Sequence, residues 1–218
     1  MKKIAFTLAE LLITMGIIGV VAALTIPTLM SSHQKKVYVT QLQRVYNQIS
    51  NAANQLMADD KVDDLTYSIL SYDAGPEQFL KNYFKVATDC GEENANNLCY
   101  ASSYKSLDGS RTEKAGVNGY CVSLETGASI CIERMYNEYQ DEKHNYSNIL
   151  VDVNGKTGPN VGGRDLFAFR LYSDGKISDF YMSEDDSRCL DRANNYISAM
   201  YGSGCFDKVV ADGWKMDY

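Results

Sequence analysis

Four oxygen-bearing side chains lie close together in one glycine-rich segment, residues 152–165. They are Asp152, Asn154, Asn160 and Asp165. Carboxylate and amide oxygens are ligands that calcium prefers, and glycines leave room for backbone carbonyls to approach a cation. The spacing departs from the EF-hand pattern after its first positions, so that motif is absent. Calcium is the one cofactor for which the sequence offers candidate ligands.

A structural loop explains the same four residues. Asn and Asp side chains often form turns with their own backbone, and Gly and Pro then set the shape of the loop. The sequence leaves both interpretations open.

The motifs of common catalytic sites are absent. The chain contains no Gly-x-Ser-x-Gly, no Walker loop and no His-Glu-x-x-His. His144 stands among Asp141, Glu142, Lys143 and Asn145, a pattern typical of a solvated loop. We therefore expect no enzymatic activity.

The chain has six cysteines, an even number that favours disulfides in an oxidising compartment. Zinc is disfavoured because there is no Cys-x-x-Cys and the two histidines lie far from any cysteine pair. Cys121 and Cys131 are equidistant from Thr126, the centre of a predicted turn. The other four bracket two polar segments. The predicted pairs are Cys90 with Cys99, Cys121 with Cys131, and Cys189 with Cys205.

The N-terminal region has the composition of a membrane helix. The 24 residues from Leu11 to Gln34 carry no Asp, Glu, Lys or Arg, and roughly 20 apolar residues suffice to cross the hydrocarbon of a bilayer. A cleaved secretory signal is the alternative, but its apolar stretch usually has only about 7–15 residues. Glu10, at the entrance of the run, also argues against it, because a carboxylate is costly in lipid.

A helical stripe of apolar residues follows the membrane segment, at steps of three and four. Its members are Tyr38, Leu42, Val45, Ile49, Ala53 and Leu56. No strong terminator precedes Asp59, so membrane segment and stripe together predict one helix of about 50 residues, loosened at Gly16, Gly19 and Pro27.

The start of this helix resembles a known signal. The run Ala5-Phe6-Thr7-Leu8-Ala9-Glu10-Leu11-Leu12 follows Lys2-Lys3 and precedes Gly16, Gly19 and Pro27. It is similar to the class III signal of type IV pilins and type II secretion pseudopilins over about 30 residues, except that the family usually has Gly where this chain has Ala5.

The resemblance implies processing and assembly. A prepilin peptidase would cut between Ala5 and Phe6 and methylate the new amine. Glu10 would then neutralise the Phe6 amine of a neighbouring subunit and set the register of a helical filament, an open heterologous assembly. The implied partners are other pilin-like subunits, the peptidase and an inner-membrane assembly platform. The implied location is the bacterial inner membrane, with the distal part in the periplasm and later in a periplasmic or cell-surface filament.

The distal part predicts short strands. Two hairpins are predicted, each with two strands on either side of a turn: Tyr120–Leu124 with Ala128–Ile132, and Leu166–Tyr172 with Lys176–Met182. A fifth strand is predicted at Asn148–Val153. Pro76 favours a helix from Glu77 to about Val86. We therefore expect an α+β fold in which the long helix packs against a small antiparallel sheet, and we expect Trp214 to dock the C-terminus.

The predicted organisation has four parts: a leader at residues 1–5, a transmembrane or filament-core half-helix at 6–30, an amphipathic half-helix at 31–58 and a disulfide-linked head at 59–218.

The two parts of the chain differ in charge. Residues 1–58 carry a formal charge of +4 and residues 59–218 one of −11. An acidic head repels phosphates, so we expect no direct nucleic-acid binding. The main alternative to a filament subunit is a membrane-anchored or secreted binding protein with a pilin-like N-terminus. A secreted hydrolase is the weaker alternative.

Overall fold

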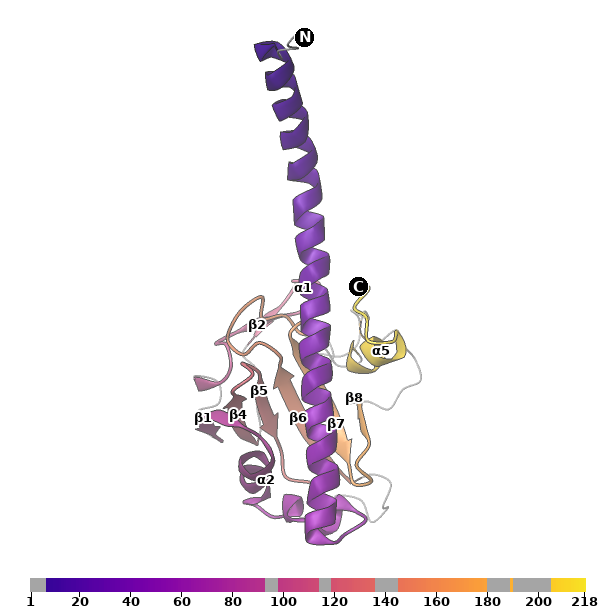
Figure 1. The fold of residues 1–218 in the computed structure, drawn as a ribbon. Helices are drawn as coiled ribbons and strands as arrows, with labels where there is room; N and C mark the ends of the chain where they lie inside the picture. The colour runs from indigo at the N-terminus through magenta and orange to yellow at the C-terminus, as the bar shows by residue number, and fades with distance from the viewer. Residues whose placement is uncertain (1–6, 93–97, 114–118, 136–144, 180–188, 190–204) are drawn as a thin grey trace, which may run out of the picture. The chain divides into compact units, whose positions relative to one another are not determined.

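A computed structural model describes residues 7–92, 98–113, 119–135, 145–179, 189 and 205–218. The chain divides into two compact units, Met1–Val37 and Tyr38–Tyr218. The long helix α1, Leu8–Asp60, contributes to both units (Figure 1). It spans 53 residues and contains Pro27.

In the first unit, the large apolar side chains of α1 from Leu8 to Met30 are exposed, at 51–80 % of their full accessible surface. By length and composition, α1 is the one helix among the described residues that is able to cross a membrane. Exposure of such a continuous apolar surface is unusual for a soluble protein and indicates contact with lipid or with other helices.

The second unit contains a six-stranded antiparallel sheet with the order β1-β4-β5-β6-β7-β8. The strands are β1 Val86–Gly91, β4 Tyr120–Leu124, β5 Ser129–Ile132, β6 Tyr146–Asp152, β7 Leu166–Tyr172 and β8 Ile177–Asp179. A separate two-stranded ladder joins β2 Tyr104–Lys105 to β3 Thr112–Glu113.

The C-terminal part of α1 packs on one face of the sheet and forms the main core (Figure 1). All six members of the predicted stripe are buried. They meet alternate residues of the strands, including Val122, Ile130, Ile149, Val151 and Phe169. The helical period of three to four and the strand period of two thus supply the two apolar surfaces of one core.

Shorter helices complete the second unit. Two 3₁₀ turns, η1 Leu65–Tyr67 and η2 Ile69–Ser71, follow α1 directly. Helix α2, Gly75–Tyr83, begins with a proline in its first turn. Helix α5, Cys205–Ala211, brings Phe206 against Phe169, with ring centroids 4.6 Å apart, and Trp214 lies 5.3 Å from Tyr46. The C-terminal segment is therefore docked on α1 and β7.

The predicted α+β class is confirmed. Both hairpins and the strand before the 152–165 segment are present, while residues 180–182 of the second hairpin lie outside the described residues. The predicted end of the helix that begins near Pro76 was wrong. Helix α2 ends at Tyr83, and Val86 opens β1, which pairs with β4. Strands β1, β2 and β3 were not predicted.

The burial of the stripe yields a stability prediction. Ile49 is 1 % exposed in the core, so Ile49→Ala is expected to lower the free energy of unfolding by about 2–5 kcal/mol. Asn51→Ala, on the exposed side of the same helix, should change it by less than about 0.5 kcal/mol. Denaturant unfolding in detergent, followed by Trp214 fluorescence, measures both. Equal effects of the two substitutions would contradict this packing.

Candidate functional site

Glu10 closes a capping box at the start of α1. Its Oε2 accepts hydrogen bonds from the backbone N–H of Thr7 and from Thr7 Oγ1, each at 2.8 Å. The backbone N–H of Glu10 donates back to Thr7 Oγ1 at 3.3 Å. A Thr-x-x-Glu box satisfies donors that the first turn of a helix otherwise leaves without partners.

This arrangement gives Glu10 a role within its own helix. In an apolar environment, unsatisfied N–H groups are costly, and a carboxylate at the N-terminal end is also favoured by the helix dipole. The predicted processing residues Ala5 and Phe6 lie outside the described residues. The ion pair between Glu10 and a neighbouring Phe6 amine therefore stays a prediction.

Three disulfides link the six cysteines. They join Cys90 to Cys99, Cys121 to Cys131 and Cys189 to Cys205, the pairs predicted from the spacing, and no cysteine is free. Cys121 and Cys131 stand directly opposite in the β4–β5 ladder. Such cross-links typically stabilise a small secreted domain by about 2–4 kcal/mol each. They indicate an oxidising compartment.

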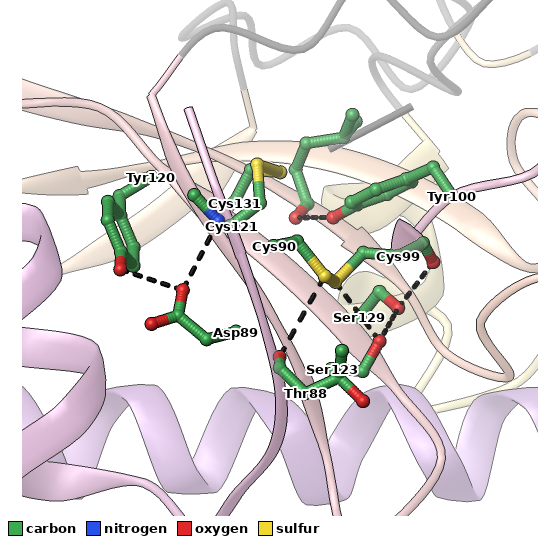
Figure 2. The surroundings of a disulfide bond; sticks show 12 residues. Thr88, Asp89, Cys90, Cys99, Tyr100, Tyr120, Cys121, Ser123, Ser129 and Cys131 are labelled. Atoms are coloured by element: carbon green, nitrogen blue, oxygen red, sulfur yellow. Dashed lines mark hydrogen bonds between the residues drawn. A yellow bond between two sulfur atoms is a disulfide. The ribbon is translucent and has the colours of Figure 1, made fainter. Parts of the chain in front are cut away.

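The first two disulfides form a second buried cluster on the sheet face opposite α1 (Figure 2). Ser123 Oγ donates to Cys99 Sγ at 3.1 Å, and Ser129 Oγ donates to the Cys99 carbonyl at 2.7 Å. Tyr100 Oη donates to the Leu150 carbonyl at 2.8 Å. The segment that begins at Cys99 is therefore fixed over β4, β5 and β6.

Asp152 is the buried end of this network. Its Oδ2 accepts from Tyr104 Oη at 2.5 Å, and its Oδ1 accepts from the backbone N–H of Asn154 at 3.1 Å. Burial raises the pKa of the Asp152 carboxyl to about 8, and the charge of Asp165 adds to the rise. Asp152 is therefore largely protonated at neutral pH.

Asp165 closes the other end of the 152–165 segment. Its Oδ2 accepts from the backbone N–H of Asn160 at 2.7 Å and its Oδ1 from that of Val161 at 2.6 Å. Burial raises its pKa as well, although the backbone donors oppose the shift. These two bonds reach back five and four residues and tie the end of the segment to its middle. The bond from the Asn154 N–H to Asp152 spans the two residues of a side-chain turn.

The four candidate calcium ligands lie in one loop, and only two of them, Asp152 and Asp165, are acidic. Among the described residues, no group of three or more His, Cys, Asp or Glu side chains is placed to hold a metal. Two oxygens are nevertheless buried without a hydrogen-bond partner, Asn154 Oδ1 and Asn160 Oδ1. Amide and carboxyl oxygens are of the type that a hard cation prefers. Calcium binding stays a prediction.

Sequence reasoning missed two tyrosines of this region. Tyr104 is fully buried and reaches Asp152 across 48 positions of sequence, and Tyr218 Oη donates to the Gly163 carbonyl at 2.7 Å. Neither contact has a local signal. His33 is exposed on α1, and His144 lies outside the described residues.

Comparisons of the chain with protein-family models, with curated proteins and with solved structures give no significant match. The function must therefore be argued from the residues and their arrangement.

The capping box yields the first prediction of this site. Thr7→Val removes the hydroxyl at nearly constant volume and should weaken the start of α1 by about 0.5–2 kcal/mol. Thr7→Ser keeps the box and is the control. Amide hydrogen exchange of the first turn in detergent micelles should be faster in Thr7→Val alone. Unchanged exchange in that variant would show that the box contributes nothing.

The buried carboxyl of Asp152 predicts a pH dependence. Its pKa lies above the ordinary value of 3.8, so the folded protein holds a proton that the unfolded chain has lost between about pH 4 and pH 8. The free energy of unfolding should therefore fall through this window as the pH rises, and be flat for this group above it. Asp152→Asn should show the shallower fall in urea titrations. Parallel curves for the two proteins would contradict a raised pKa.

The loop predicts a response to calcium. If the oxygen donors hold the ion, the unfolding temperature should be higher in millimolar calcium than in a chelator. A ligand that binds only the folded state stabilises it by about 2.7 kcal/mol when the free ligand concentration is 100 times Kd. Asp165→Asn should lose the response, whereas Asp217→Asn, outside the loop, should keep it. If the native protein melts at the same temperature with calcium and with chelator, residues 152–165 form a structural loop and not a calcium site.

Proposed function

We propose that this chain is a pilin-like structural subunit of a bacterial helical filament, of the type IV pilus or type II secretion pseudopilus kind. In this proposal a prepilin peptidase cuts between Ala5 and Phe6, and the N-terminal helix anchors the subunit in the inner membrane with its second unit in the periplasm. An assembly platform then moves α1 from lipid into the filament core.

The observation that carries the proposal is the exposed apolar surface of α1 from Leu8 to Met30 together with a carboxylate at its start. A simple membrane anchor needs the apolar surface, and a glutamine would close the capping box as Glu10 does, whereas the charge of a carboxylate raises the cost of insertion. A filament uses both: apolar packing between helices and an acid that fixes their register.

The disulfides support the proposed location, because they require an oxidising compartment on the far side of the membrane. The cytoplasmic end of α1 would then be the end that carries Lys2 and Lys3, in line with the preference for positive charge on the cytoplasmic side. The resemblance of residues 5–12 to the class III signal points in the same direction.

A membrane-anchored binding protein is the main alternative, and Glu10→Gln separates the two. Glutamine keeps the acceptor that a capping box needs but loses the charge. In the native host, we expect Glu10→Gln to insert in the membrane at the native level and to be nearly absent from sheared filaments. Thr14→Val, which also removes a polar group from the first turns of α1, serves as the matched control. Full incorporation of Glu10→Gln would contradict the role given to the Glu10 charge, and absence of the native protein from sheared filaments would favour the anchored binding protein.

A further inference from the structure

The two turns after α1 present a pair of exposed aromatic side chains. Tyr67 and Tyr72 are 74 % and 69 % exposed, the highest values for large hydrophobic residues of the second unit among those described. They are flanked by the exposed carboxylates of Asp63 and Asp73, and Asp73 already pairs with Arg134 Nη1 at 2.5 Å. We call these four residues the tyrosine platform.

The backbone of the tyrosine platform is held from several sides. Asp64 accepts from the Thr66 N–H at 2.7 Å, and Asp60 accepts from the Ile69 N–H at 2.9 Å. Ser71 Oγ donates to the Thr66 carbonyl at 2.6 Å, which ties the second turn to the first.

Buried residues anchor the platform to the rest of the second unit. Leu65 and Leu70 are fully buried, and their backbone groups bond to Ser173 and Met135. A Cβ at Gly75 would stand 1.9 Å from the Ile69 carbonyl oxygen, so a glycine is required where the chain passes under the second turn. Aromatic side chains on a preorganised backbone bind at low entropic cost, which is typical of the energetic centres of interfaces.

The charge around the tyrosine platform selects a cationic partner. The segment from Asp59 to Asp73 carries five aspartates and one lysine. The helix before it has the opposite sign, because α1 contains no acidic residue from Leu11 to Ala58 but carries Lys35, Lys36 and Arg44. Arg44 is exposed and makes no ion pair within the described residues. A guanidinium suits both components of the platform, since it stacks on tyrosine rings and pairs with carboxylates.

One molecule is unable to join these two surfaces by itself. Sixteen helical positions separate Arg44 from Asp60, which is about 24 Å along the axis of α1. In the part of α1 that belongs to the second unit, Arg44 lies about two turns after the start at Tyr38, and Asp60 is the last residue. A contact between them requires a second copy, and such a head-to-tail contact is heterologous, so in a filament it repeats from one subunit to the next.

We propose that the tyrosine platform of one copy binds the Arg44 side of α1 in a second copy. The inference rests on the proposed filament and adds to it a specific contact outside the apolar core. Arg44 lies between the rings of Tyr67 and Tyr72 and pairs with Asp63. The apolar helices supply affinity, and this charged contact selects which subunits become axial neighbours.

Reciprocal charge exchange in the full-length protein tests the contact. Arg44→Glu and Asp63→Arg each place like charges together and should lower the amount of subunit in sheared filaments about tenfold or more. The double variant restores opposite charges and should return to within about threefold of the native amount. Lys215→Glu, an exposed charge reversal outside both surfaces, should assemble normally.

Aromatic substitutions provide an independent test. Tyr67→Ala with Tyr72→Ala should reduce assembly, whereas the two Tyr→Phe changes should preserve it because the rings are kept. In every variant, mobility on non-reducing gels and Trp214 fluorescence check that the second unit is folded.

The outcomes separate the contact from the proposed function. Absence of native filaments would overturn both. Native filaments, with single charge variants that assemble normally or a double variant that is not restored, would overturn the contact alone.

Discussion

The packing of the second half of α1 on the six-stranded sheet is the interaction on which the rest of the structure depends. Leu42, Ile49 and Leu56 are at most 1 % exposed. Helix α1 is the one long helix on this face among the described residues, and its buried side chains form one core with those of the sheet (Figure 1). Helix α1 includes both the exposed apolar residues and those buried in this core.

The opposite face of the sheet depends on covalent and polar contacts. Two disulfides and the segment from Cys99 to Tyr104 cover it, and Tyr104 meets the buried Asp152. Burying a carboxyl requires either a proton or a counter-charge. In the 152–165 loop, the side chains of Asp152 and Asp165 accept hydrogen bonds that shape the chain, and burial raises the pKa of both carboxyls.

The features predictable from sequence were those with a local pattern. The stripe from Tyr38 to Leu56 repeats at the helical period, and the symmetry of Cys121 and Cys131 about Thr126 fixed both a hairpin and a disulfide. Strand β1 was missed because Val86–Gly91 gains its strand structure from β4, whose paired residues lie 30 to 38 positions away. The Thr7–Glu10 capping box has a recognisable spacing, but the acid was assigned to a contact between subunits and its bond within the helix was overlooked.

The central claim is that α1 begins at a processed N-terminus and leaves the membrane for a filament. Intact-mass and N-terminal peptide analysis of the protein from its native membrane tests this most directly. The account predicts a chain that starts at Phe6 and carries one additional methyl group on its amine. A chain that starts near Leu24 would contradict it, because the apolar surface and Glu10 would then be lost with a secretory signal.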